Sequence, residues 1–337
     1  MRERIRVLIA ACFYYSGLVK LAHWRIRRSG KHLIILNYHR ATGKNLRQQM
    51  YYLHRHYRIL HLETALEELY SERKDKKAPD RRIPLVLTFD DGYRDNYTHG
   101  FAFARELQIP FTIFLIPCYT ESGCRFWWLE GDYLVKHAQA SDVTIDGRTY
   151  SLMRNEDQVS LARLIDTRLR HSESVVEREA YLEFIRKSLH FSPAITMEED
   201  LSSPLTWAEI YKMEESGLIS FGAHTLNHPV LSCLSDPEEV KHEVQACKEV
   251  LEQKLGHSIH TFAYPIGKFE HFGEQGLQAV KEAGYKWAFT TIEEINTPQS
   301  DPYLLNRLPG DIEQHWLVMA SELVGLLGIF SRIRKKL

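Results

Sequence analysis

The sequence is organised around a buried strand that ends in charge, the stretch LVLTFDDG at residues 85–92. Its first five side chains form a continuous, largely apolar run rather than an alternating one, which is typical of a strand covered on both faces. Asp90 and Asp91 follow directly, and Gly92 favours a turn after them. Functional sites in α/β barrels gather where strands end and loops begin, so this strand end is a candidate site.

Five further runs share this continuous apolar character. They are IILNY at 34–38, FTIFLI at 111–116, ISFG at 219–222, IHTFA at 259–263 and WAFTT at 287–291. Helical patterns separate them: SDPEE at 235–239 is a strong helix start, Gly256 is expected to end that helix, and a shorter helix is expected from Glu274 to Gly284. Alternating strands and helices predict a parallel sheet that is either closed or doubly wound.

One segment breaks this alternation, from about residue 118 to residue 203. Within it, residues 143–150 predict a hairpin around Asp146-Gly147, and residues 156–190 predict two charged helices. The aromatic run FWWL at 126–129 is interpreted as the core of this segment, with sugar stacking as the alternative. We interpret the whole segment as an insertion that covers or extends a groove.

Composition excludes several classes of protein. The 337 residues carry a net charge of −1, so there is no global basic field for nucleic acid, and we expect no nucleic-acid partner. The five cysteines are too few and too scattered for a disulfide framework.

The two ends of the chain combine basic and apolar residues. Residues 1–40 hold nine Arg or Lys and one acid, and the run from Val7 to Val19 is uncharged. That run of about 13 residues is short for a bilayer span, which needs roughly 20, and no small-x-small cleavage site follows it. Trp316 to Phe330 is also largely apolar and precedes four basic residues. The ends are either amphipathic helices that pack on the protein or a basic face for peripheral contact with a membrane. We expect a cytoplasmic protein, or one peripheral at the inner membrane face, with secretion as the alternative.

A second polar cluster follows a predicted strand, where His224 and His228 stand four residues apart. Pro229 disfavours a helical conformation at His228, which favours a turn there. Taken alone, such histidines are more often hydrogen-bonded loop residues, and an Asp-Asp pair is more often a turn. Taken together, Asp91 and the two histidines form an N,N,O set with open positions, which suits Zn²⁺ or another divalent transition metal. Asp90 beside this set fits a general base.

These motifs resemble those of the polysaccharide deacetylases of carbohydrate esterase family 4, the NodB-homology domain. The resemblance rests on TFDDGY at 88–93 and HTLNH at 224–228, supported by LNYHR at 36–40, FAYPIG at 262–267, GYKWAFTT at 284–291 and NRLP at 306–309. It covers roughly residues 36 to 311. It implies a distorted (β/α)7-type barrel over 33–315 that contains the insertion, with a basic and apolar helix at 1–32 and an amphipathic basic tail at 316–337.

The resemblance also implies roles for individual residues. Asp91, His224 and His228 would bind one divalent metal, with Zn²⁺ as the first expectation and Co²⁺, Ni²⁺ or Mn²⁺ as alternatives. Asp90 would be the general base. The substrate and its oxyanion would meet a second group of residues, which consists of Tyr93, Tyr264, Pro265 and the backbone N–H of Ile266.

The sequence departs from the family pattern at two places. Many members carry an arginine in the third motif that pairs with the base, and this sequence has Ala263 there. Arg307 is the candidate substitute. Many members also carry a C-terminal Leu-x-His motif that supplies the acid; none is found, and His39 is the candidate acid.

The predicted function is therefore a metal-dependent hydrolase that removes N-acetyl groups from a polysaccharide or glycan intermediate, using metal-activated water and an Asp base. An O-acetyl esterase or a hydrolase of another C–N bond on the same fold is an alternative. A non-catalytic glycan-binding partner is a third.

Overall fold

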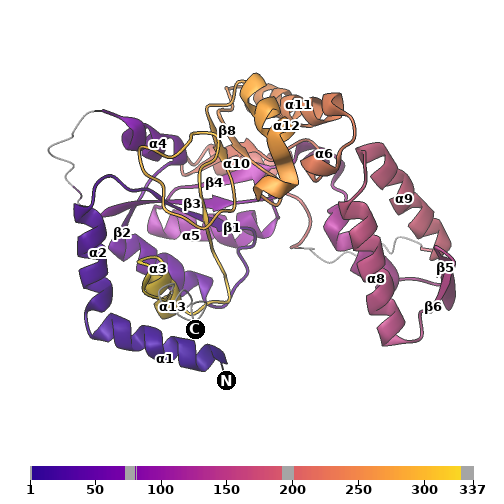
Figure 1. Cartoon of the computed structure of the whole chain (residues 1–337), viewed down its shortest axis with the longest axis horizontal. Helices are drawn as coiled ribbons and strands as arrows, with labels where there is room; N and C mark the ends of the chain where they lie inside the picture. Colours follow the sequence, from indigo (N-terminus) through magenta and orange to yellow (C-terminus); the bar gives the residue numbers. More distant parts are fainter. Residues whose placement is uncertain (1, 73–79, 81, 192–200, 328–337) are drawn as a thin grey trace.

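A curled parallel sheet forms the centre of the computed structural model, which describes residues 2–72, 80, 82–191 and 201–327 (Figure 1). The strands are β1 (Ile34–Tyr38), β2 (Tyr57–Ile59), β3 (Ile83–Phe89), β4 (Phe111–Leu115), β7 (Ile219–Ala223), β8 (Thr261–Ala263), β9 (Trp287–Phe289) and β10 (Leu308–Pro309). Their order is β10-β1-β3-β4-β7-β8-β9, with β2 also paired to β3, and every pair is parallel.

One segment near the C-terminus contacts both edges of this sheet. Leu305 bridges to Phe289 of β9, and Leu308 pairs with Leu36 of β1. The sheet is thereby curled toward closure, and the predicted α/β class and distorted (β/α)7-type barrel are confirmed.

All six strands predicted from the sequence are present in this sheet. The sheet contains two more strands that the sequence analysis did not predict. The missed strands, β2 and β10, are three and two residues long, too short to show a periodic pattern. Strand β9 ends at Phe289 rather than Thr291, because Thr290 and Thr291 donate their backbone N–H groups to the carbonyls of Leu305 and Gly267 outside the sheet.

Most of the helices pack against one face of the curled sheet, whereas the second helix of the following set, α4, contributes to the apolar cluster on the other face. They are α3 (Leu46–His56), α4 (Leu62–Tyr70), α5 (Phe101–Leu107), α6 (Pro117–Ser122), α10 (Trp207–Glu214), α11 (Pro237–Leu255), α12 (Phe269–Glu282) and α13 (Trp316–Glu322). The predicted caps of α11 are present: the Asp236 side chain accepts from the N–H of Glu238, and Gly256 ends the helix in a left-handed conformation. Helix α12 begins five residues before the expected Glu274, with a break at Gly273.

The predicted insertion forms a lobe beside the barrel (Figure 1, right). It contains η2 (Trp127–Leu129), α7 (Glu130–Lys136), β5 (Asp142–Ile145), β6 (Arg148–Ser151), α8 (Asn155–Arg170) and α9 (Val175–Ser188). Strands β5 and β6 pair in antiparallel orientation and form the predicted hairpin. Asp146 and Gly147 at its turn both have positive φ, as a tight hairpin turn requires. The lobe has its own apolar cluster, in which Phe126 and Trp127 are buried, as expected for a core role.

The N-terminal segment is two helices rather than the single one expected over 1–32. They are α1 (Arg2–Tyr15) and α2 (Leu18–Arg28), which meet at 68°. Gly17 lies at the bend with a φ of 85°, a conformation that glycine adopts at little cost. No single described helix is long and apolar enough to span a membrane; α1 and α2 reach that length and composition only as a bent pair. The expected tail at 316–337 begins with α13, and its residues 328–337 lie outside the described part of the chain.

Candidate active site

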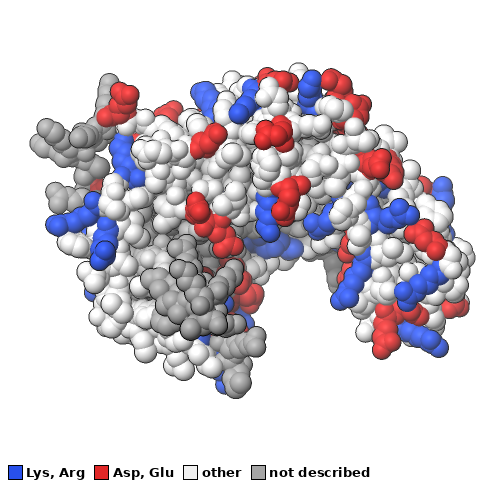
Figure 2. All heavy atoms as spheres, viewed as in Figure 1, with Lys and Arg blue, Asp and Glu red and all other residues white. Residues whose placement is uncertain are grey.

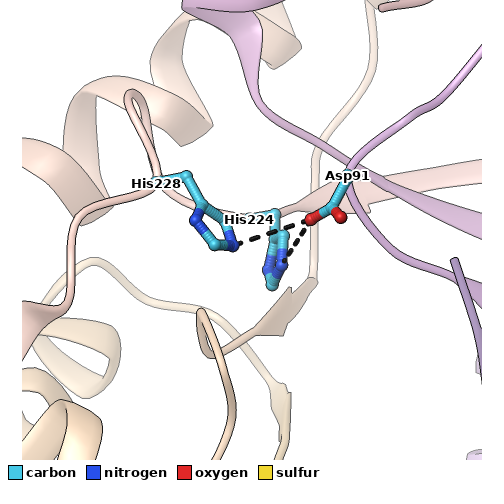
Figure 3. Close-up of side chains that lie close together, drawn as sticks. All are labelled: Asp91, His224 and His228. Carbon is cyan, nitrogen blue, oxygen red and sulfur yellow. Dashed lines mark ion pairs between the residues drawn. The ribbon is translucent and has the colours of Figure 1, made fainter. Parts of the chain in front are cut away.

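The predicted metal-binding residues come together at the carboxyl edge of the sheet. Asp91 follows β3, and His224 and His228 follow β7. The Nε2 atoms of His224 and His228 lie 3.4 and 3.6 Å from Oδ1 of Asp91, and all three side chains point toward one centre (Figure 3). Their candidate ligand atoms lie within 4.8 Å of one another, and all three residues are buried.

Hydrogen bonding shows that this cluster fits a divalent cation. Nδ1 of His224 donates to the backbone oxygen of Ala263 at 2.7 Å, which leaves a lone pair on Nε2 facing the Asp91 carboxylate. Burial opposes protonation of His224, but Asp91 and Asp90 outweigh it and raise the pKa of this imidazole. Burial lowers the pKa of His228 to about 3, so this ring is neutral. Two imidazole lone pairs and a carboxylate thus face a site that favours positive charge, the donor set that Zn²⁺ and similar ions prefer.

The loop between the histidines is a turn, as Pro229 predicted. Thr225 and His228 have φ values of 65° and 56°, and Asp91 also lies in the left-handed region at 72°. The Thr225 hydroxyl accepts from the backbone N–H of His228 at 3.0 Å and thereby stabilises the turn. Such conformations are costly for residues other than glycine and are concentrated at functional sites.

Arg307 meets Asp90 beside this cluster. Its two terminal nitrogens lie 2.7 and 2.8 Å from the two carboxylate oxygens, and its Nε donates to the backbone oxygen of Thr290. Arg307 is 1% exposed and Asp90 2%. Burial would raise the pKa of Asp90, but Arg307 and His224 outweigh that effect and lower it to about 2. Arg307 therefore gives Asp90 a positively charged partner, and this pairing favours the ionised form of Asp90.

His39 is the exposed member of the site and follows the end of β1. His39 is among the smaller causes that lower the pKa values of Asp90 and Asp91. The amide of Asn96 donates to the His39 backbone oxygen at 3.0 Å. Asp95 is fully buried and accepts from the Arg40 side chain and from the N–H of Ala41. These contacts fix the loop that carries His39.

The residues predicted to meet substrate have different surroundings. Tyr264 is fully buried, stacks on Phe272 and donates to the backbone oxygen of Tyr303, so its side chain belongs to the core rather than to a substrate surface. Pro265 and Ile266 follow it in a loop. Ile266 has a φ of 62°, and its backbone N–H forms no hydrogen bond to any other described residue. This N–H is therefore free to donate to an oxyanion.

Tyr93 contributes to an aromatic wall beside the metal cluster. Its hydroxyl accepts from Nε1 of Trp128, and the Arg40 guanidinium lies over its ring. Trp128 stacks against Phe126 and lies 4.5 Å from the His228 ring, measured between centroids. The insertion thus brings an aromatic side chain directly against a predicted metal ligand.

Sequence reasoning did not find several residues that contact the site. Thr225, Asp95, Glu243 and Arg178 all bond to the loops that carry the predicted functional residues. Thr225 had a local signal, because a threonine inside H-x-x-x-H can close a turn. Arg178 had none, because it is 49 residues from its partner Asn227 in the sequence.

Fold and site together define a class of protein: a curled parallel barrel whose strand ends present an Asp-His-His cluster beside a buried Asp–Arg pair. The chain belongs to the polysaccharide deacetylase family, because the model of that family matches residues 77–178 and 184–288. The resemblance seen in the motifs is thereby confirmed.

One curated relative and two solved structures illustrate what the chain is similar to. YxkH of Bacillus subtilis (strain 168), named as a polysaccharide deacetylase, is 26% identical over 104 residues, which are 31% of this chain and 36% of that protein. The Streptococcus pyogenes deacetylase PplD, solved in complex with acetate, shares the fold with a TM-score of 0.56 and 18% identity, over 86% of this chain and 97% of that one. IcaB from Ammonifex degensii shares it with a TM-score of 0.55 and 18% identity, over 87% and 97%.

Proposed function

We propose that this protein is a metal-dependent deacetylase that hydrolyses N-acetyl groups of a polysaccharide or of a glycan intermediate. The observation that carries the proposal is that two adjacent carboxylates at one strand end have different partners. Asp91 faces His224 and His228, whereas the adjacent Asp90 is turned to Arg307 and is left out of the metal cluster. A binding module has no need of a second, separately ionised carboxylate at that position.

Each residue has a defined task in this reaction. A divalent cation held by Asp91, His224 and His228 would polarise the acetyl carbonyl and lower the pKa of the attacking water. Asp90, kept ionised by Arg307, accepts a proton from that water as its oxygen bonds to the carbonyl carbon. The N–H of Ile266 donates to the oxyanion. His39 then donates a proton to the amine nitrogen as the C–N bond breaks, which releases acetate and the free amine.

Acetate release tests this proposal directly. Purified protein loaded with Zn²⁺ would be incubated with N-acetylated and O-acetylated oligosaccharides, beside Asp90→Asn and His224→Ala variants. We expect release from the N-acetylated set, strongly reduced in Asp90→Asn although that variant still binds metal. Release only from the O-acetylated set would make the protein an esterase. Glycan binding without release, at one metal per chain, would make it a binding partner.

We also propose that the protein acts in the cytoplasm or at the inner membrane face, on a glycan before its export. The basic residues concentrated in α1 and α2 support this location, because positively charged segments are retained on the cytoplasmic side. N-terminal sequencing of protein from the native cell tests it: the expected N-terminus lies within the first residues, and one beyond residue 20 would contradict it.

A further inference from the structure

Helix α1 begins with charged residues, of which Glu3, Arg4 and Arg6 are exposed. It also carries apolar side chains on two sides, and the described residues cover only one of these sides. Its packed side contacts α13 and consists of Val7, Ala10, Ala11 and Tyr14, at helical spacing. The opposite side carries Ile5, Leu8 and Tyr15, which are 50%, 66% and 76% exposed. Large apolar side chains that gather on one helix side are ordinarily buried, and no described residue removes this outer side of α1 from water.

Helix α2, which follows α1 after the bend at Gly17, also exposes apolar side chains and carries positive charge beside them. Leu18, Leu21 and Trp24 recur every three residues and are 42%, 53% and 44% exposed. The Arg28 guanidinium lies over the Trp24 ring at 4.3 Å, and Arg25 shares this side of the helix. In Figure 2 basic side chains gather over α2.

We propose that α1 and α2 form a lipid-binding face for the surface of an anionic bilayer. This face consists of Ile5, Leu8, Tyr15, Leu18, Leu21, Trp24, Arg25 and Arg28. Leucine, isoleucine and aromatic side chains enter the boundary between headgroups and acyl chains, and arginines on the same side meet anionic headgroups. The packing of α1 on α13 fixes the helix parallel to the protein surface, so the same segment lies on a bilayer while the barrel stays outside it.

This proposal adds a second partner to the proposed deacetylase, but vesicle binding needs no catalysis, so the two can fail separately. The full-length protein would be sedimented with vesicles of phosphatidylcholine, alone or with about a third phosphatidylglycerol. The test variants are Leu8→Glu with Leu21→Glu, and Arg25→Glu with Arg28→Glu. The matched control is Val176→Glu with Phe184→Glu on α9, where the native side chains are 78% and 50% exposed.

We expect the native protein and the α9 control to bind the anionic vesicles, and to bind less as salt screens the arginines. Both α1–α2 variants should lose binding on the order of tenfold. All variants should release acetate from a soluble N-acetylated oligosaccharide as the native protein does. Equal binding by native protein and α1–α2 variants, or no binding by either, overturns the proposal. The proposal would also be overturned if the native protein formed a dimer and the variant with Leu8→Glu and Leu21→Glu did not. That result would assign this face to a second copy of the chain.

An independent observation concerns the loop between the two histidines. Glu243 of α11 accepts from the backbone N–H and the side-chain amide of Asn227 at 2.8 and 2.7 Å, and Arg178 of α9 donates to the Asn227 backbone oxygen at 3.1 Å. Glu243 is 1% exposed and Arg178 2%. In addition, Nε1 of Trp127 donates to the backbone oxygen of His228 at 2.9 Å. Two buried side chains, Glu243 and Arg178, thus bind the backbone N–H and the backbone oxygen of the same residue, Asn227.

We infer that Arg178 and Trp127 are positioning residues of the metal centre, supplied by the insertion. Arg178 also pairs with Glu179 at 3.1 Å. Removing the Arg178 guanidinium would leave the Asn227 backbone oxygen without the donor that the insertion supplies. Because Asn227 directly precedes His228, such a change would shift this imidazole. Residues that orient metal ligands typically affect metal affinity about 10–100-fold.

Metal binding tests this inference without using activity. Arg178→Met would be compared with Arg186→Met, a control on the same helix whose arginine pairs with Glu130 at 3.1 Å. We expect Arg178→Met to bind Zn²⁺ about 10–100-fold more weakly and to change the Co²⁺ absorption spectrum, and Arg186→Met to retain both properties. If Arg178→Met does not fold, Arg178→Lys and Trp127→Phe are measured in the same way. Native affinity and a native Co²⁺ spectrum in the folded variants overturn the inference.

Discussion

At the scale of single residues, the chemistry depends on how Asp90 is kept ionised in a buried position. A carboxylate without a partner would take up a proton there, because burial penalises charge. The bidentate contact with Arg307 supplies the opposite charge and fixes the orientation of both oxygens. Asp90 and Arg307 are 217 residues apart in the sequence. The ion pair that would keep the proposed base ionised therefore exists only in the folded protein.

This pairing predicts a specific loss of stability. We expect Arg307→Met and Asp90→Asn each to lower the free energy of unfolding by ~3–5 kcal/mol, because each leaves a buried charge uncompensated. The double variant should lose less than the sum of the two. Urea unfolding of metal-free protein would measure this cycle, and additive losses would show that the pair is not coupled.

The Asp90–Arg307 pair also predicts how the free energy of unfolding changes with pH in acid. The folded pKa of Asp90, about 2, lies below its ordinary value of 3.8. The pairing energy is therefore present above about pH 4 and is lost as the pH falls toward 2. Arg307→Met should lose this part of the pH dependence, and native protein with a flat curve between pH 4 and 2 would contradict the prediction.

His39 predicts a difference between two kinds of leaving group. An amine must be protonated as it leaves, whereas a nitrophenolate departs without a proton. We expect His39→Gln to lower kcat on an N-acetylated sugar by ~10²–10⁴ and to affect 4-nitrophenyl acetate hydrolysis much less. Zn²⁺ affinity should be unchanged. Equal losses on both substrates would mean that His39 does not act as the acid.

At the scale of the elements, the strands bring the ligands together and their interior residues set the spacing. Gly222 lies two residues before His224 in β7, against β4 and β8. A Cβ at this position would lie 2.6 Å from both the Phe114 ring and the Thr261 hydroxyl. Strand β7 can therefore approach its neighbours only because residue 222 has no side chain.

Gly222→Ala should consequently damage both packing and metal binding. We expect a loss of ~1–3 kcal/mol in unfolding free energy from overpacking, together with weaker Zn²⁺ binding. Gly256→Ala at the end of α11 is the control. It should cost ~1–2 kcal/mol through its positive φ and leave Zn²⁺ affinity unchanged. Denaturant unfolding and a metal titration separate the two effects, and identical metal affinity in both variants would contradict the prediction.

At the scale of the whole molecule, the Asp91-His224-His228 cluster connects two strands that are not neighbours. Asp91 follows β3 and the histidines follow β7, with β4 between them. A cation bound there cross-links the barrel across one strand and favours the folded state over the unfolded one. Since Arg178 and Trp127 contact the same loop, the insertion is part of this linkage.

Metal removal should therefore lower the stability of the entire protein. At a free Zn²⁺ concentration 100 times Kd, we expect a stabilisation of ~2.7 kcal/mol relative to protein treated with a chelator. The Tm of His228→Ala should respond much less to Zn²⁺. Thermal unfolding followed by circular dichroism would measure both, and a native Tm that is independent of metal would contradict the proposed cluster.

The sequence by itself determined the parallel α/β architecture, the six main strands, the hairpin, the caps of α11 and the residues that gather at the strand ends. These features depend on near neighbours: continuous apolar runs, capping side chains and Asp-Gly turns act within a few residues. The carboxyl ends of parallel strands meet at one edge, so Asp91, His224 and His228 could be grouped before their distances were known.

The tertiary structure alone decided the remaining features. Strands β2 and β10 are recognised only by their pairing with adjacent strands, because two or three residues are too few to show a pattern of apolar side chains. Tyr264 belongs to the core because it contacts Phe272 and Tyr303. The contact between α1 and α13 determines which side of α1 is exposed. Arg178 reaches Asn227 only because the insertion folds back onto the barrel. Such contacts form between residues far apart in the chain, and their energies depend on burial, which no local stretch of sequence specifies.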